Sequence, residues 1–180
     1  MNPRVGVCLA FLALLTPALS GCATAEQPSA IQTAAPPADL PGEYDPDNIL
    51  ARAARDEIPS AKLFEDEYVL ALLIDRPSSR GHFLVISKQS QARNFLELDE
   101  ATNAKIVAAA KKVARAEIRA LGAQGFTLRQ NNGSASGVFQ YHLHVIPRWA
   151  GDSLPTGRQP LVDMQTLEDT AALIRSRIDH

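Results

Sequence analysis

Polar and apolar positions alternate along the stretch FQYHLHVIPRW, residues 139–149. Successive side chains of a β-strand point to opposite faces, so Gln140, His142 and His144 share one face of this stretch. Pro147 has no backbone N–H to give to a sheet, and the pattern predicts a strand over 139–146 that ends before it. The opposite, apolar face of that strand carries Phe139, Tyr141, Leu143 and Val145.

Four more apolar segments predict strands. Segments 61–65 and 68–74 flank an acidic turn and predict a hairpin. Residues 83–86 form a continuous apolar run, as in a strand that is buried on both faces, and 126–130 is the fourth segment. With the strand at 139–146, these segments predict an antiparallel sheet of about five strands.

Capping residues indicate where the helices begin and end. Asp47 or Asn48 can cap a short helix that reaches about Asp56. Asp99 can cap a long helix that Gly122 ends, and a last helix is predicted over 164–178. Helices and strands in this order predict an α+β domain. The side chains of the long helix expected to face the sheet are Val107, Ala110, Ala114, Ile118 and Leu121.

The first 21 residues predict a secretory signal: one early cation, an apolar run shorter than a membrane span, and then small residues. Their end, Leu19-Ser20-Gly21-Cys22, resembles the lipobox of bacterial lipoproteins. The resemblance implies cleavage after Gly21, lipid attachment to Cys22, and a periplasm-facing protein held on the outer membrane. An ordinary signal peptide, cut near the same place, is the alternative.

Composition changes after the signal. Residues 22–44 are rich in Ala and Pro and predict an extended tether, which leaves 45–180 as one domain. The net charge is −2 with acidic and basic residues mixed, so no basic field indicates a nucleic acid partner.

Histidines are the candidate catalytic residues of this domain. His142 and His144 share a strand face beside the small-residue loop 131–137, and His82 precedes another strand. Neutral imidazole is a good nucleophile near pH 7, and a second imidazole can bind a phosphoryl oxygen or protonate a leaving group. Backbone N–H groups of the loop can bind phosphate oxygens. Two alternatives are a set of hydrogen-bonded core histidines and a zinc site built from the three imidazoles.

Five segments in the same order resemble the histidine triad family of nucleotide hydrolases and transferases: YDPDNI, DEIPSAKLFEDEYVLAL, RGHFLVISK, NNGSASG and YHLHVIPRW. The resemblance implies an α+β fold, often a homodimer. It also implies that a strand histidine attacks phosphorus and forms a nucleotidyl-histidine intermediate, without a cofactor or metal.

The same resemblance implies residue roles. His142 is the nucleophile, His144 assists it, and Gln140 takes the place of the family's first histidine, which orients the nucleophile. The other implied site residues are His82 together with the substrate-binding Asn131, Gly133, Ser134, Asp75, Ile49, Leu50 and Ile58.

Three departures from the family pattern affect these roles. Gln140 cannot carry the positive charge of a histidine. The loop lacks two residues that follow its last glycine in the family, and an ungapped alignment would make His144 the nucleophile. Ile74 occupies the place of the family's ribose-binding aspartate, and Asp75 comes one position later.

The function expected from these features is a membrane-tethered hydrolase. It would cleave a phosphoramidate or phosphoanhydride bond of a nucleotide-like molecule through a phosphohistidine-type intermediate. The alternative is a catalytically degenerate protein that binds a nucleotide or another anion.

Overall fold

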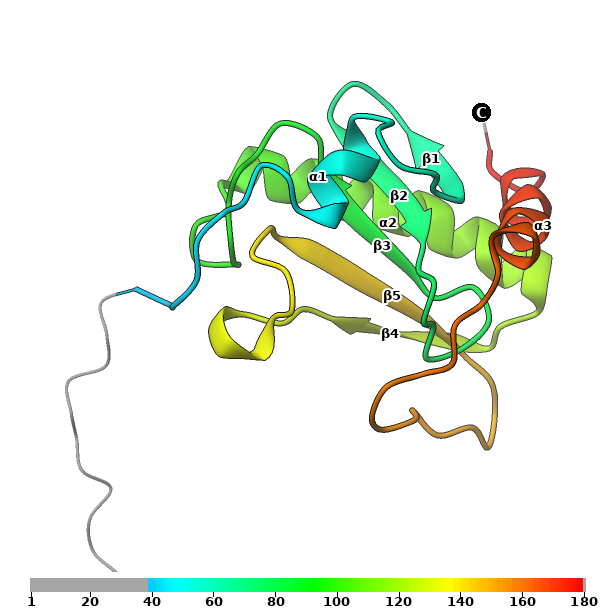
Figure 1. Cartoon of the computed structure of the whole chain (residues 1–180). Coiled ribbons are helices and arrows are strands. Elements are labelled where there is room, and N and C mark those ends of the chain that lie inside the picture. Colours follow the sequence, from blue (N-terminus) through cyan, green and yellow to red (C-terminus); the bar gives the residue numbers. More distant parts are fainter. Residues whose placement is uncertain (1–38, 180) are drawn as a thin grey trace, which may run out of the picture. The chain divides into compact units, whose positions relative to one another are not determined.

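A computed structural model describes residues 39–179 and shows one five-stranded antiparallel sheet (Figure 1). The strands are ordered β1-β2-β3-β5-β4, so β4 and β1 form the edges. The predicted α+β class and the five strands are confirmed. The strand bounds are β1 Lys62–Glu65, β2 Val69–Leu73, β3 Phe83–Ser87, β4 Gly125–Arg129 and β5 His142–Arg148.

Three helices pack against the sheet, and predicted residues cap the first two of them. Helix α1 (Ile49–Ala54) begins after Asn48, whose side chain accepts the N–H groups of Leu50 and Ala51. Helix α2 (Glu100–Leu121) is capped by Asp99 and ends at Gly122, which has a left-handed φ of 67°. Helix α3 (Met164–Arg175) is three residues shorter than predicted.

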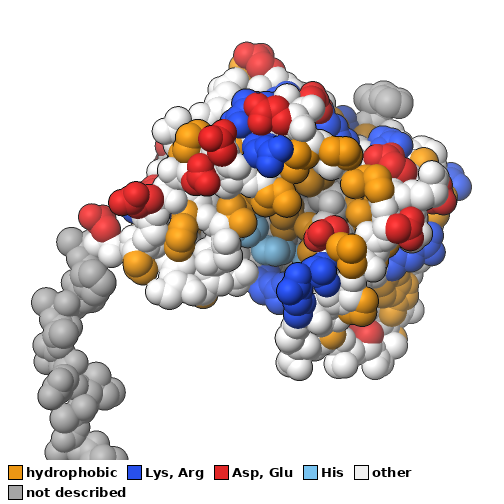
Figure 2. All heavy atoms as spheres, in the orientation of Figure 1, with side chains coloured by type: hydrophobic (Ala, Val, Ile, Leu, Met, Phe, Trp, Pro, Cys, Tyr) orange, Lys and Arg blue, Asp and Glu red, His pale blue; other side chains and the backbone are white. Residues whose placement is uncertain are grey.

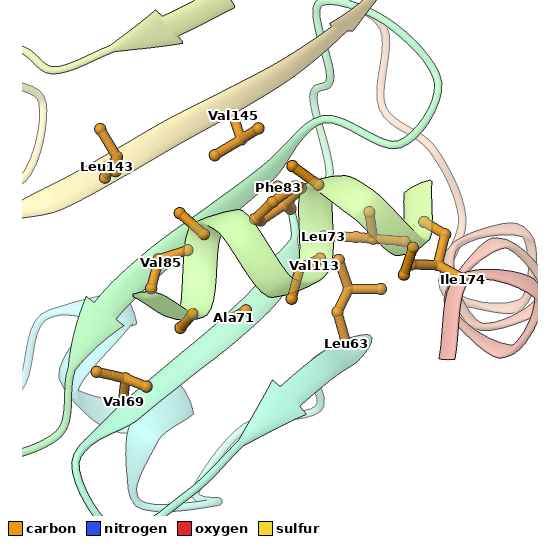
Figure 3. Close-up of a cluster of buried hydrophobic side chains, with 14 of the residues drawn as sticks. Leu63, Val69, Ala71, Leu73, Phe83, Val85, Val113, Leu143, Val145 and Ile174 are labelled. Atoms are coloured by element: carbon orange, nitrogen blue, oxygen red, sulfur yellow. The ribbon is translucent and has the colours of Figure 1, made fainter. Parts of the chain in front are cut away.

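The main core lies between one sheet face and the helices α2 and α3 (Figures 1 and 3). Leu143 and Val145 of β5 point into it, as the alternation predicted, and meet Val85, Phe83 and Val113. Each fully buried side chain of this size contributes roughly 1.5–3 kcal/mol. This face therefore holds β5 in place and fixes which of its residues point the other way.

On the second face of the sheet, the histidines of β5 lie in the same cross-strand rows as apolar side chains of β2 and β3. Strand pairing sets Leu72, Leu84 and His144 in one row across β2, β3 and β5. The neighbouring row ends in His142 and is covered by α1 through Leu50 and Ala53. Two imidazoles of β5 thus continue rows that are hydrophobic across β2 and β3.

The predicted bounds of β5 were wrong at both ends, because the strand begins at His142 instead of residue 139 and runs through Pro147 instead of ending before it. Pro147 pairs with Phe126 of β4, while β3 begins opposite Val145. The Pro147 carbonyl accepts the Ser79 hydroxyl at 2.8 Å, on the side where β3 has not yet started. A proline is tolerated there because its missing N–H would have no strand to bind.

The predicted buried face of α2 was partly wrong. Ala110 and Ala114 are buried, but Ile118 is 39% exposed and Glu117 takes its place in the interior. The many alanines of this helix allow more than one side to approach the sheet closely. The apolar periodicity therefore does not fix the rotation of the helix.

The last six residues of the predicted tether, 39–44, are part of the described structure. Residues 39–44 contact the domain, since Leu40 and Pro41 pack on Gly133 and the Arg93 guanidinium donates to the Gly42 carbonyl. The predicted signal peptide and Cys22 lie outside the described residues. Within 39–179, no helix has the length and apolar character that a membrane span requires.

Candidate active site

Three histidines meet on the second face of the sheet. His142 and His144 come from β5, and His82 comes from the turn that enters β3. The His82 and His144 ring centroids are 5.1 Å apart, and those of His142 and His144 are 5.0 Å apart. Figure 2 shows histidine atoms at the bottom of a recess, with hydrophobic side chains above them and basic side chains beside them.

A hydrogen-bonded chain fixes the tautomers of His82 and His144. The Ser78 N–H donates to His82 Nδ1 at 3.0 Å, so the ring proton of neutral His82 is on Nε2. That proton points to His144 Nδ1, 2.9 Å away. Neutral His144 therefore carries its own proton on Nε2, and this buried atom has no partner among the described residues. The site presents an unused hydrogen-bond donor to a ligand.

His142 has the opposite tautomer. Its Nδ1 donates to the Gln140 carbonyl at 2.7 Å, which leaves the lone pair on Nε2. A neutral imidazole held in this way is a nucleophile at Nε2. The nucleophilic nitrogen of His142 and the donor nitrogen of His144 thus belong to neighbouring rings on one strand face.

Burial keeps all three imidazoles neutral. Desolvation lowers the pKa of His82 to about 4, with a further contribution from the positive charge of Arg129. Desolvation also lowers the pKa of His144 to about 3, assisted by the neighbouring histidines and Arg129. The pKa of His142 is lowered by burial and raised in part by its bond to Gln140. At neutral pH the nucleophile needs no deprotonation.

Gln140 connects the nucleophile to helix α1. Its side chain is 3% exposed, its Oε1 accepts Asn48 Nδ2 at 3.0 Å, and its Nε2 donates to the Ser87 carbonyl at 3.4 Å. Because Asn48 also caps α1, one buried amide joins the start of that helix to β3 and β5. The structure brings Gln140 to the site through its carbonyl and not through contact of its side chain with an imidazole.

An apolar cavity of about 280 Å³ adjoins the histidines. Leu84 lines it and is the cross-strand neighbour of His144. The cavity is also lined by Ile49, Leu50, Ile58 and Asp75, so the structure gathers these four sequence-predicted residues at one place. Asp75 is exposed, whereas Ile74 is half-buried and packs with the apolar residues of the second face. The wall of the cavity nearest the sheet is therefore aliphatic.

The predicted phosphate-binding loop connects β4 to β5 and leads into the histidine strand at His142. Gly133, Ser134 and Ala135 form one turn of 3₁₀-helix, which the sequence did not indicate. The Gln130 side-chain amide donates to the Asn131 carbonyl, and Gly133 is buried against residues 40 and 41. No described hydrogen bond joins Asn131, Gly133 or Ser134 to the imidazoles, so their phosphate contacts stay a prediction.

The sequence did not point to Arg129 as a site residue. It is the last residue of β4 and pairs directly with His144, so both side chains lie on the histidine face. The sequence showed that Arg129 and Thr127 share one face of their strand. It did not show that Arg129 lies opposite His144, because the register between distant strands is set by packing.

The arrangement of the three imidazoles does not match the zinc alternative. His82 Nε2 and His144 Nδ1 face each other at hydrogen-bonding distance and are occupied by that bond. No group of three His, Cys, Asp or Glu side chains within 39–179 is placed to hold a metal ion.

Comparisons with known proteins agree with this geometry. The HIT domain family model matches residues 55–151. Adenylylsulfatase HINT3 of Arabidopsis thaliana is 35% identical over 119 residues, which are 60% of this chain but only 58% of that protein. Adenosine 5'-monophosphoramidase hnt1 of Schizosaccharomyces pombe is 35% identical over 102 residues, which are 56% of this chain and 73% of that protein.

A solved structure supports the same relationship. A Hit-like protein from Bartonella henselae is 36% identical and superposes with a TM-score of 0.71, over 76% of this chain and 100% of that one. The matched region contains the sheet, the histidine strand and the loop before it. The chain therefore belongs to the histidine triad (HIT) family.

Proposed function

We propose that this protein is a hydrolase that transfers a phosphoryl group of a nucleotide-like molecule to His142 Nε2 and then to water. The observation that carries the proposal is the bond from His142 Nδ1 to the Gln140 carbonyl, which places the lone pair on Nε2. The names of the two enzyme relatives, a monophosphoramidase and an adenylylsulfatase, support cleavage of a bond between phosphorus and a leaving group.

In the first step, the Nε2 lone pair of His142 forms a bond to phosphorus while the bond to the leaving group breaks. The leaving group takes the electron pair of the broken bond, together with a proton from solvent if it is an amine. The modified imidazole becomes positively charged because it keeps its Nδ1 proton. In the second step, water adds to phosphorus, its proton passes to solvent, and the electron pair of the P–N bond returns to Nε2. The ring is neutral again after one cycle.

The apolar cavity supports a role for the organic part of the substrate. It lies beside His144 and can bury a flat or aliphatic group next to the reacting phosphorus. The unpaired Nε2–H of His144 can donate to a phosphoryl oxygen, and His82 holds that ring in the required tautomer.

Single-turnover hydrolysis of adenosine 5'-phosphoramidate, with the adduct mapped by peptide mass spectrometry, tests the proposal. We expect a covalent adduct on His142. His142→Ala should abolish adduct and turnover but keep ligand binding in calorimetry, which serves as the control for folding. His144→Ala should slow the reaction by about 10²–10⁴-fold, the usual effect of one acid–base or charge-stabilising group.

Two outcomes would change the assignment. An adduct on His144 would move the nucleophile and support the ungapped alignment. Saturable nucleotide binding, with neither adduct nor turnover for phosphoramidates, dinucleotides and mixed anhydrides, would replace the hydrolase by a binding protein.

We also propose that the domain is held at a membrane surface through lipid on Cys22. The support is the Leu19-Ser20-Gly21-Cys22 motif and the Ala/Pro-rich segment that follows it. A substrate for such a site would be supplied outside the cytoplasm.

A further inference from the structure

Arg129 places a positive charge at the histidine cluster. It lies on the edge strand β4, directly across from His144. Directly opposed residues of an antiparallel pair have Cβ atoms about 4.5–5.5 Å apart on one face, so the arginine stem begins beside the imidazole. On the other side of His144 lies Leu84, and beyond it the apolar cavity. The row thus runs from an apolar pocket, through the imidazole, to a cation.

The guanidinium of Arg129 is free to bind a ligand. Arg129 is exposed and takes part in no ion pair within residues 39–179. Its charge is close enough to depress the pKa of both His82 and His144. The buried Nε2 of His144, the residue directly opposite Arg129 in the strand pairing, also has no hydrogen-bond partner among residues 39–179. An unpaired cation and an unpaired donor on one face form a site for an oxyanion.

A phosphoramidate releases an amine and a phosphoryl anhydride releases an oxyanion, and these two leaving groups need different help from the site. An amine that leaves phosphorus must receive a proton, whereas a phosphate, sulfate or carboxylate leaves as an anion and needs a positive charge. With a pKa of about 3, His144 is protonated in only about one molecule in 10⁴ at pH 7. Arginine stays charged at every working pH and binds oxyanions through two parallel hydrogen bonds.

We propose that Arg129 binds the departing group and that the preferred substrates are phosphoryl anhydrides with an anionic leaving group, in preference to phosphoramidates. This inference rests on the proposed function, because it assigns the leaving group of that reaction. As His142 Nε2 bonds to phosphorus, the P–O bond to the leaving group breaks. The electron pair stays on the departing oxygen, where Arg129 stabilises it, and no proton is transferred in that step.

Two substrates that differ only in the leaving group provide the test: the mixed anhydride of adenosine 5'-phosphate with sulfate, and adenosine 5'-phosphoramidate. In the wild type we expect a higher kcat/KM for the anhydride. Arg129→Gln should lower kcat/KM for the anhydride by about 10²-fold, as removal of one charge-stabilising group does. The same variant should change kcat/KM for the phosphoramidate by less than about 3-fold. Arg129→Lys should retain part of the anhydride activity, since it keeps the charge but not the paired hydrogen bonds.

Arg115→Gln is the matched control. Arg115 is exposed on α2, which covers the opposite face of the sheet, so this variant removes the same charge far from the histidines. It should leave both substrates unaffected. Equal losses on both substrates in Arg129→Gln, or no loss on either, would overturn the assignment of Arg129 to the leaving group.

A binding measurement separates this inference from the hydrolase proposal. Pyrophosphate should bind the wild type in calorimetry, and Arg129→Gln should weaken its binding by at least about 10-fold. If the wild type forms no adduct but this difference holds, the hydrolase proposal fails and the oxyanion site stands. If adduct forms on His142 and Arg129→Gln binds pyrophosphate as the wild type does, the hydrolase stands and the role of Arg129 falls.

Discussion

Gln140 stands where the family has its first histidine. It still orients His142, but it cannot supply the positive charge of an imidazolium. Its carbonyl fixes the tautomer of His142, and any residue at this position could supply that carbonyl. Its buried side chain instead bonds Asn48 and the Ser87 carbonyl, with one acceptor and one donor. Since glutamine cannot become charged, it places no positive charge beside the nucleophile.

Glu117 is the residue whose environment gives the clearest prediction for pH. It is 1% exposed, its Oε1 has no partner among the described residues, and a Cβ on Gly81 would lie 2.5 Å from that oxygen. Desolvation raises the pKa of Glu117 from 4.5 to about 9. Between these two values the folded state holds a proton that the unfolded state has lost. Stability therefore falls as pH rises, by about 1.4 kcal/mol per unit.

Glu117→Gln should remove this dependence. Urea unfolding at pH 6 and pH 8.5 should show the variant gaining about 3 kcal/mol relative to the wild type over that interval. Glu100→Gln, an exposed position of the same helix, should show no relative gain. A constant difference between Glu117→Gln and wild type at both pH values would mean that Glu117 is already ionised in the fold.

At the scale of elements, local signals predicted most of the fold. Asn48, Asp99 and Gly122 marked helix ends because capping depends on a few adjacent residues. The alternation through His142 predicted the two faces of β5 for the same reason. Tertiary packing decided the rest: Pro147 stays in the strand because β3 has not begun, a fact that no local pattern contains.

The candidate site also has a part that the sequence predicted and a part that only tertiary packing decided. The sequence pointed to the histidines and to Gln140, because they form one strand pattern and a family resemblance. It could not show that Arg129 lies opposite His144, or that Asn48 bonds Gln140 across 92 positions of the chain. Both contacts depend on the register and docking of separate elements.

Helix α1 gives a testable link between the cavity and the histidine strand. Asn48→Ser keeps an oxygen that can cap the helix but loses the amide donor to Gln140, and Gln140→Leu removes the acceptor. In urea unfolding, the double variant should lose less free energy of unfolding than the two single variants lose together. The difference, which is the coupling energy of the Asn48–Gln140 bond, should be about 1 kcal/mol. Additive losses would show that the Asn48–Gln140 bond does not hold α1 to β5.

For the whole molecule, the edge strand β4 supports the expected homodimer. Phe126 is 48% exposed and Leu128 is 55% exposed, and both lie on an unpaired sheet edge. Such an edge is normally covered, and a second copy can continue the sheet. Residues 39–179 should therefore form a dimer at micromolar concentration in light scattering, and Leu128→Lys should shift it towards monomer. Leu96→Lys, at a loop position that is 76% exposed, is the control. A monomeric wild type would contradict this proposal.

The proposed lipid anchor has its own measurement. In a bacterial host, Cys22→Ser should block lipid attachment and processing by the lipoprotein peptidase, and the protein should leave the detergent-soluble membrane fraction. Cys8→Ser, which changes the other cysteine, should fractionate as the wild type does. An N-terminal peptide of the wild type without acyl mass would remove the lipoprotein assignment.

The segment before α1 has a mechanical consequence. The chain enters the domain at residues 39–44, where the Gly42 carbonyl is held by Arg93 and Gly42 lies against the ring of Phe139. Tension applied through the N-terminus is therefore loaded first onto these contacts, next to the loop that leads into the histidine strand. The strands of the sheet would bear that load only after this attachment had given way.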